Sequence, residues 1–264
     1  MYIWQRPDWP AFRWDAQRLL PIMAEARFRQ GRFLGTMASL GFELRLTSEL
    51  AAMTDDAVQT SAIEGQALDP ASVRSSVARR LGLPDGGLCH DRTIDGVVDM
   101  LLDATHRFTA PLTAQRIHGW HAALFPTGYS GIEAIDVGCW RNDRLGAMQV
   151  VSGVYGKPRI HFEAPPAARV PAEMERFLTW FEQGGDDLDG LQRAALAHLW
   201  FVTIHPLDDG NGRIGRAIAD LAMARVEAIG QRFYSLSDQI QRERAAYYDV
   251  LERTQHCDLD VTDR

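Results

Sequence analysis

The residues best suited to chemistry lie in one twelve-residue stretch, His205-Pro-Leu-Asp-Asp-Gly-Asn-Gly-Arg-Ile-Gly-Arg216. The preceding residues, Leu191 to Ile204, are apolar on nearly every side, which predicts a buried helix. Pro206 disfavours helical geometry in the residue before it. We therefore expect the imidazole of His205 at the exit of a buried helix.

A segment suited to phosphate groups follows this histidine. Gly210, Asn211 and Gly212 leave the backbone free to point successive amide groups into one concavity. An amphipathic helix is predicted directly afterwards, from Arg213 to Val226, so that its N-terminus faces the loop. Free amides and the positive end of a helix dipole together favour anion binding.

Charged side chains complete this predicted anion site. Arg213 and Arg216 are three residues apart on one side of the second helix, and a guanidinium group can hold phosphate oxygens in pairs. An acidic residue among these donors indicates that a cation binds as well. Asp209 is well placed to hold the Mg²⁺ that accompanies ATP.

Simpler interpretations of the same residues are less consistent with the whole string. Asp-Asp-Gly-Asn-Gly is a common turn composition. A calcium-binding loop is excluded by its spacing. If Asp209 and Asn211 took its third and fifth positions, the apolar residues Leu207 and Ile218 would take its first and twelfth, where oxygen ligands are needed. His205 with Asp208 or Asp209 is a weak metal pair, and no third ligand follows at metal spacing.

The string resembles the signature of the Fic family of AMP transferases, His-Pro-Phe-x-Asp/Glu-Gly-Asn-Gly-Arg-x-x-Arg, at eleven of twelve positions. Leu207 replaces the phenylalanine and keeps an apolar anchor. The resemblance implies that AMP passes from ATP to a Ser, Thr or Tyr hydroxyl of a target protein, with His205 as the base and Asp209 as the Mg²⁺ ligand. By the same resemblance, the α- and β-phosphates would bind to Gly210, Asn211 and Gly212. Arg213 would neutralise the charge of the polyphosphate, and Arg216 would bind the γ-phosphate.

A second motif, Thr60-Ser-Ala-Ile-Glu-Gly65, lies at the predicted end of an earlier helix. A negative side chain at a helix C-terminus is unfavourable by about 0.3–1 kcal/mol, so another contact should offset the charge of Glu64. The motif resembles the family's inhibitory sequence, Ser/Thr-x-x-x-Glu-Gly/Asn, which implies that Glu64 pairs with Arg216 and keeps the γ-phosphate from seating. The alternative is an exposed glutamate with a local backbone bond to Thr60.

A short hairpin is predicted from Met148 to Phe162, where β-branched residues flank glycines. It resembles in position the flap that family members place over the active site. An exposed strand edge can hold a target segment by strand addition, with Val150, Val151, Ile160 and His161 as the docking residues. The alternative is a hairpin with a structural role only.

The remaining sequence predicts a mainly helical fold around this site. The opening segment, with Trp4, Trp9 and Trp14, is expected to be irregular and pinned to the core by its aromatic side chains. Gly138-Cys-Trp-Arg141 resembles an element that precedes the flap in the family. Helices are expected at residues Asp15 to Ala52, in a stretch ending at Gly65, and at Pro70 to Arg80, Asp95 to Thr105, Ala114 to Leu124, Pro171 to Glu182 and Ser237 to Arg253.

The resemblance divides the chain into three parts. Residues 1–90 would be a helical region whose inhibitory helix ends near residue 65, residues 91–251 the catalytic core, and residues 252–264 a tail. Relatives in a bacterial subgroup continue into a winged-helix domain, so the chain is expected to be truncated before one. Tyr247 and Tyr248 are expected either near the base or in the core.

Composition limits the classes of function. The chain has 264 residues, 46% of them hydrophobic, a net charge of −7 and three cysteines without Cys-x-x-Cys spacing. No basic surface for nucleic acid, disulfide framework or zinc knuckle is indicated. No stretch approaches the roughly 20 apolar residues of a membrane span, so we expect a soluble, cytoplasmic protein without a membrane or nucleic-acid partner.

Four functions fit the motifs, and adenylyl transfer leads. A phosphotransferase of the Doc type is disfavoured, because those relatives carry lysine where Gly212 stands. Removal of AMP, alone or in a bifunctional enzyme, would use the same residues with Glu64 aligning a water molecule. A non-catalytic regulatory module is disfavoured because every polar signature position is present. Expected partners are an unidentified target, the chain itself through auto-AMPylation, and a second copy, since many relatives dimerise.

Overall fold

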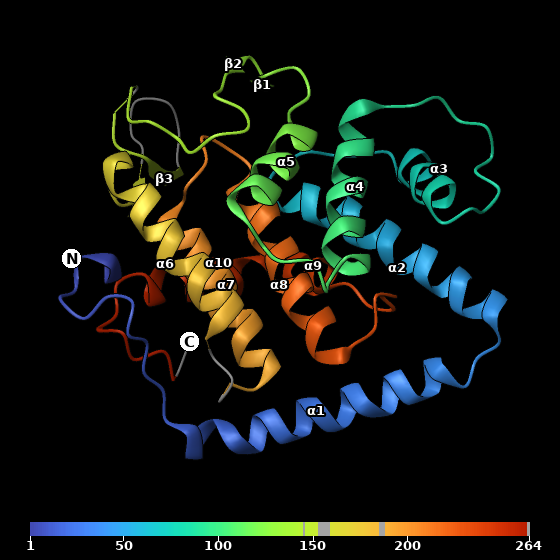
Figure 1. Ribbon diagram of the computed structural model, residues 1–264, viewed down its shortest axis with the longest axis horizontal. Helices are drawn as coiled ribbons and strands as arrows, with labels where there is room; N and C mark the ends of the chain where they lie inside the picture. The colour runs from blue at the N-terminus through green and yellow to red at the C-terminus, as the bar shows by residue number, and fades with distance from the viewer. Residues whose placement is uncertain (145, 153–158, 185–187, 263–264) are drawn as a thin grey trace.

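Two helices, α7 (Gly190–Ile204) and α8 (Asn211–Glu227), form the centre of the computed structural model (Figure 1). The structure describes residues 1–144, 146–152, 159–184 and 188–262. Phe201, Ile204, Ile218 and Leu221 of this pair are inaccessible to solvent. Burying each such side chain stabilises the fold by about 1.5–3 kcal/mol, so the pair gives the loop between them a rigid support.

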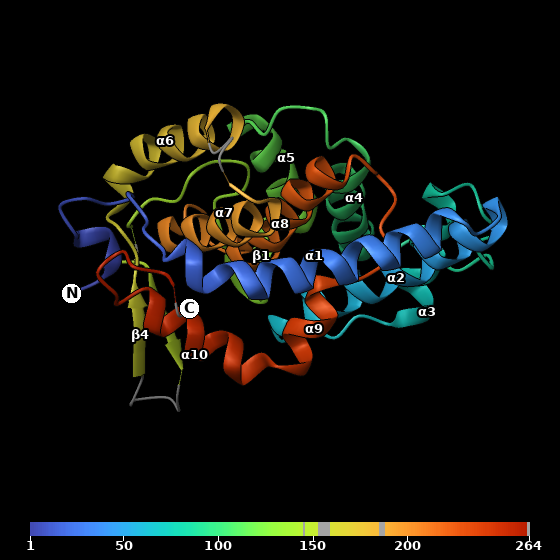
Figure 2. The same cartoon turned by 90° about the horizontal axis from the view of Figure 1, so that it is seen from below.

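Eight further helices of the described chain surround this pair. In chain order they are α1 (Ala16–Ala38), α2 (Phe42–Ile63), α3 (Pro70–Arg80), α4 (Arg92–His106), α5 (Ala114–Leu124), α6 (Val170–Gln183), α9 (Leu236–Arg242) and α10 (Arg244–Thr254). Helices α4 and α5 pack on α8, and α6 packs on α7. Helix α1 lies along the outside of the bundle and has no buried residue (Figure 2). No helix of the described residues is long and apolar enough to cross a membrane.

Two short antiparallel hairpins accompany the helices. The first pairs β1 (Tyr129–Ser130) with β2 (Glu133–Ala134), and the second pairs β3 (Gln149–Ser152) with β4 (Arg159–Glu163). The second is the hairpin predicted from the sequence, and its connection, residues 153–158, lies outside the described residues. The prediction of a mainly helical fold with a short hairpin is therefore confirmed. Two single-turn 3₁₀ helices, Ile3–Gln5 and Ala167–Arg169, complete the elements.

Several predicted helix boundaries were wrong, among them the start of α4, which begins at Arg92, three residues before the predicted Asp95. The expected helix from Asp15 to Ala52 is interrupted at residues 39–41, where Gly41 leaves the helical conformation and precedes α2. The expected helix from Ser237 to Arg253 breaks at Glu243, whose φ of −110° and ψ of 30° separate α9 from α10. Helix α8 begins at Asn211, two residues earlier than the predicted start at Arg213.

The opening segment is pinned to the core as predicted. Trp4 and Trp9 are buried; the indole Nε1 of Trp4 donates to the carbonyl of Glu163 at 2.7 Å, and that of Trp9 donates to Glu173 at 3.0 Å. Trp14 is only half-buried. The contact with Glu163 places the N-terminal segment against the base of the second hairpin.

Candidate active site

The conformation of His205 is set by the end of α7. Its backbone is left-handed, with φ 52° and ψ 57°, and its N–H donates to the carbonyl of Phe201 at 3.0 Å. Such a conformation costs a non-glycine residue roughly 1–2 kcal/mol, so the surrounding contacts must hold it. Leu207, two residues later, is fully buried and provides one of these contacts. The chain therefore turns sharply at the histidine and leaves its ring at the helix exit.

The ring of His205 has one nitrogen free to accept a proton. Its Nδ1 lies 3.1 Å from the carbonyl oxygen of Val202. Because a carbonyl oxygen only accepts, Nδ1 must carry the hydrogen and Nε2 must carry the lone pair. Burial is the largest cause of a lowered pKa at His205, and the positive charge of Arg141 lowers it further. The neutral ring is therefore the form present at pH 7, as a general base requires.

Arg141 joins this loop to the end of the second hairpin. Its Nε donates to the carbonyl of His205 at 2.7 Å, and its Nη2 donates to the carbonyl of Pro165, just after β4. Its Nη1 also contacts Asp143 at 2.6 Å, which balances the charge of a buried guanidinium. The sequence singled out this residue only as part of a motif before the flap, because the contacts it makes are distant along the chain.

Asn211 fixes the shape of the loop from inside. Its Oδ1 accepts from the N–H of Leu207 at 3.0 Å, and its Nδ2 donates to the carbonyl of the same residue at 2.8 Å. Both ends of the side-chain amide are therefore engaged within the protein. Gly210 has φ 79°, and a Cβ there would lie 2.9 Å from the ring of Phe125. Both conditions favour glycine at this position.

The N-terminus of α8 and Arg213 leave donors for an anion. No side chain caps the first turn of α8 in the described part of the chain, so its amides are available to a ligand. Arg213 is nearly buried, stacks over the ring of Phe125 at 4.9 Å, and donates from Nη1 to Gln66 at 3.0 Å. Its Nε is buried without a partner among the described residues. Burial also lowers the pKa of Arg213. A phosphate oxygen would satisfy this donor.

Arg216 is held by the end of α2. Its Nε donates to Thr60 Oγ1 at 2.8 Å, and its Nη2 donates to the carbonyl of Thr60 at 2.8 Å and to Glu64 Oε1 at 2.7 Å. The guanidinium is 2% exposed, and its Nη1 has no partner among the described residues. A Cβ on Gly212 would lie only 2.0 Å from Glu64 Oε1. The carboxylate of Glu64 therefore occupies space directly against the first turn of α8.

Asp209 and Asp208 connect the loop to the first hairpin region. Asp209 accepts a short hydrogen bond from the hydroxyl of Ser130 in β1, and Asp208 accepts from the N–H of Asp136 at 2.8 Å. No group of three or more metal-binding side chains occurs among the described residues. A single carboxylate fits Mg²⁺, which commonly binds through one or two carboxylates, water and the phosphates of a nucleotide.

The four residues expected to dock a target occupy different environments. Val151 and Ile160 are 53% and 47% exposed, whereas Val150 is half-buried. Both ring nitrogens of His161 bind within the protein, Nε2 to Ser152 Oγ at 2.6 Å and Nδ1 to Glu252 at 2.7 Å. Of the four predicted docking residues, Val151 and Ile160 therefore have exposed side chains that a target segment could contact.

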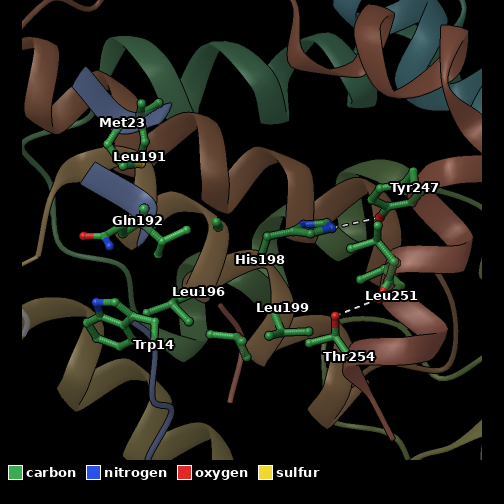
Figure 3. A pocket seen from close by; sticks show the side chains of 14 residues that line it. Trp14, Met23, Leu191, Gln192, Leu196, His198, Leu199, Tyr247, Leu251 and Thr254 are labelled. Carbon is green, nitrogen blue, oxygen red and sulfur yellow. Dashed lines mark hydrogen bonds between the residues drawn. The ribbon is translucent and has the colours of Figure 1, made fainter. Parts of the chain in front are cut away.

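A cavity of about 390 Å³ lies between α1, α7 and α10 (Figure 3). Apolar side chains such as Met23, Leu196 and Leu251 line it, and no Lys or Arg does, so it does not suit a triphosphate. At its wall, Nε2 of His198 lies 2.8 Å from the hydroxyl of Tyr247. Burial lowers the pKa of His198 to about 4 and raises that of Tyr247 to about 12, so both side chains are neutral at pH 7.

Sequence reasoning missed several residues of this site. Gln66 binds Arg213, Ser130 binds Asp209, and Arg244 donates to the carbonyl of Ile63 beside Glu64 at 2.8 Å. Their residue types carry no sequence signal, because their role depends on which distant residue each one meets.

Family models match two parts of the chain. Residues 111–223 match a model described as the Fic/DOC family, and residues 2–83 match one described as a domain of unknown function, DUF4172. A relative named uridine 5'-monophosphate transferase, from Xanthomonas campestris pv. campestris (strain 8004), is 30% identical over 125 residues. The match covers 44% of this chain and 22% of the relative. The chain therefore spans less than a quarter of that protein.

Solved structures show the same fold. A Fic family protein from Desulfovibrio desulfuricans G20 matches 93% of this chain and 68% of its own, with a TM-score of 0.67 and 23% identity. A Fic domain containing signaling protein from Bacteroides thetaiotaomicron VPI-5482 matches 82% of this chain and 76% of its own, with a TM-score of 0.59 and 18% identity. Fic-1 from C. elegans matches 89% of this chain and 68% of its own, with a TM-score of 0.53 and 21% identity. These similarities extend beyond the loop to most of the helices.

Replacing Asn211 with alanine should destabilise the protein by about 2–4 kcal/mol, because two buried backbone groups of Leu207 lose their partner. The free energy of unfolding in urea measures this change. Gln17→Ala is the control, since the Gln17 side chain is exposed, has no hydrogen bond among the described residues and is expected to change stability by less than about 0.5 kcal/mol. Equal stability of the two variants would contradict the assigned role of Asn211.

Proposed function

We propose, on the premise that residues 111–223 match the Fic/DOC family model, that the chain is a protein adenylyltransferase that moves AMP from ATP to a Ser, Thr or Tyr hydroxyl. The observation that carries the proposal is the juxtaposition of a neutral imidazole and an anion site. His205 and the first turn of α8 are the two ends of one loop, and Arg213 and Arg216 extend from that turn. This arrangement can place a hydroxyl and a phosphate side by side.

The proposed reaction is a displacement at the α-phosphorus of ATP. The target hydroxyl oxygen forms a bond to this phosphorus while the bond to the α,β-bridging oxygen breaks, and pyrophosphate leaves. The hydroxyl proton passes to Nε2 of His205, which carries the lone pair because the Val202 contact holds the hydrogen of the neutral ring on Nδ1. The backbone amides at the start of α8 and the side chain of Arg213 are the donors for the charge on the phosphates.

Asp209 is the residue that would hold Mg²⁺ in this site. Its carboxylate is oriented by the hydroxyl of Ser130, as outer contacts commonly orient a metal ligand. The ion would supply positive charge to the departing pyrophosphate. The Asp209 side chain therefore supports ATP, with its bound cation, as the form of the substrate.

Glu64 supports a built-in inhibition. Its carboxylate lies 2.7 Å from Arg216, the residue that we propose binds the γ-phosphate. It also lies against Gly212, in the turn that we propose binds the other phosphates. Two anions cannot share this space, because like charges at short distance repel strongly in a buried site. A nucleotide that binds while Glu64 is in place would sit with its α-phosphorus displaced from the hydroxyl.

Transfer of UMP is the second candidate, and the name of the Xanthomonas relative favours it. The phosphate contacts described above are common to ATP and UTP, so the base must be tested directly. Removal of AMP by a water molecule aligned on Glu64 would use the same groups. Incubation with α-labelled ATP, α-labelled UTP, γ-labelled ATP and an AMP-modified protein separates transfer of either nucleotide, phosphorylation and hydrolysis.

Replacing Glu64 with glycine should raise labelling of protein by α-³²P-ATP at least about tenfold. The charge-assisted contact to Arg216 that would be lost contributes about 1.5–3 kcal/mol, and 1.4 kcal/mol corresponds to a factor of ten. Glu43→Gly, near the exposed start of the same helix, is the control. Labelling that stays at the wild-type level in Glu64→Gly rules out the proposed inhibition.

In the Glu64→Gly background, His205→Ala should lower labelling by about 100-fold or more, because the proton of the hydroxyl loses its acceptor. Binding of ATP, measured by calorimetry, should stay within about threefold, since the imidazole is not among the proposed phosphate ligands. A variant that retains full labelling would remove His205 from the mechanism.

The labelling rate of Glu64→Gly should be constant between about pH 7 and 8.5. Burial lowers the pKa of His205 from its ordinary value of about 6.5, so Nε2 is already free at neutral pH and becomes protonated only in more acidic solution. The rate should therefore fall as the pH decreases below about 6.5. ATP affinity measured at each pH is the control, and a rate that rises steeply above pH 7 would indicate a different base.

A further inference from the structure

The apolar anchors of the hairpin β3–β4 lie at its base. Phe162 is 1% exposed and packs edge-on against the ring of Tyr2 at 5.1 Å, and Trp4 binds the carbonyl of Glu163. Farther along, Val151 and Ile160 are about half exposed. The outer part of the hairpin therefore needs another contact to keep a defined position.

An irregularity in the strand pairing directs one side chain toward α10. Val150 pairs with Phe162, but the next residue, Val151, pairs with Ile160, so His161 has no partner across the ladder. An extra residue of this kind is a β-bulge, which bends the strand and re-aims a side chain. The ring of His161 is consequently able to reach Ser152 on β3 with one nitrogen and α10 with the other.

Glu252 of α10 contacts two side chains of β4. Its Oε2 lies 2.7 Å from Nδ1 of His161, and its Oε1 lies 2.8 Å from Nη2 of Arg159. The hydrogen bond from His161, followed by that from Arg159, lowers the pKa of Glu252. Each carboxylate oxygen is thus used by a different residue of the hairpin, which restrains rotation of the strand better than a single contact.

The same helix holds the end of α2. Arg244, Tyr248 and Glu252 are spaced by four residues, so they form one stripe along α10. Arg244 donates to the carbonyl of Ile63 at 2.8 Å, and the hydroxyl of Tyr248 lies 3.5 Å from the same oxygen. One rigid helix therefore contacts both the segment that carries Glu64 and the outer part of the hairpin.

We infer that Glu252 is a positioning residue for the protein substrate, because through His161 and Arg159 it fixes the hairpin edge relative to the His205–Arg216 loop. The inference rests on the proposed function, in which this edge docks the target. For strand addition to bring the target hydroxyl to the imidazole of His205, the strand edge must have a fixed position and direction relative to that imidazole. Glu252 touches neither the nucleotide-binding turn nor His205 in this arrangement.

Amide hydrogen exchange of the intact protein tests whether Glu252 holds the hairpin. Glu252→Ala should speed exchange of the paired amides in β3 and β4 about tenfold, because two charge-assisted contacts are lost. Glu252→Gln keeps one acceptor oxygen and should retain part of the protection. Arg253→Ala, an exposed neighbour on the same helix, is the matched control and should leave exchange unchanged. Unaltered exchange in Glu252→Ala overturns the inference.

Labelling of proteins in the Glu64→Gly background tests whether the contacts of Glu252 with the hairpin affect nucleotide transfer. With α-³²P-ATP and proteins of an added cell lysate as acceptors, Glu252→Ala should lower labelling about tenfold at unchanged ATP affinity, and Glu252→Gln should lower it less. An equal loss of ATP affinity, or undiminished labelling, overturns the inference. If Glu64→Gly itself transfers no nucleotide, the proposed function fails, and the exchange measurement still decides whether Glu252 holds the hairpin.

Discussion

The charge of one buried guanidinium, that of Arg216, sets the main constraint on this structure. A charged group removed from water is destabilising by several kcal/mol unless an opposite charge and hydrogen bonds accompany it. Thr60 and Glu64 provide both, and they do so from the end of α2, more than 150 residues away in the chain. The packing of the N-terminal helices on the central pair therefore has an electrostatic reason as well as an apolar one. In the proposed function, the phosphates of a nucleotide take over the role of the carboxylate.

The loop between α7 and α8 is preorganised by contacts that leave its chemical groups free. Asn211 closes the loop on the backbone of Leu207, Arg141 holds the carbonyl of His205, and Val202 orients the imidazole. Each contact uses groups that a ligand would not need. In the proposed function, once Glu64 has moved away, Nε2 and the amides of the first turn of α8 are presented without rearrangement of the loop, which is how a rigid site reduces the free energy needed to reach a transition state.

Helix α10 gives the two sides of the site a common support. Its stripe of Arg244, Tyr248 and Glu252 meets the end of α2 on one turn and the hairpin on another. In the proposed function, these are the inhibitory segment and the edge that docks the target. The relative positions of Glu64, His205 and the hairpin β3–β4 are therefore set mainly by the packing of helices, and less by the loops that connect them.

Apolar periodicity and signature spacing are local properties of a sequence, so they were sufficient to predict the helical class of the fold and to name candidate site residues in the twelve-residue string and the Thr60–Gly65 motif. The break at residues 39–41 and the split at Glu243 could not be predicted with that precision, since local periodicity says little about where packing ends a helix. The sequence by itself determined which side chains are present for chemistry and the order in which they occur. Only the tertiary structure decided that Asn211 would bind its own loop, that Arg141 would reach His205 and that Glu252 would meet His161. The contacts of Arg141 and Glu252 join residues distant in the chain, and they form only after the helices have packed.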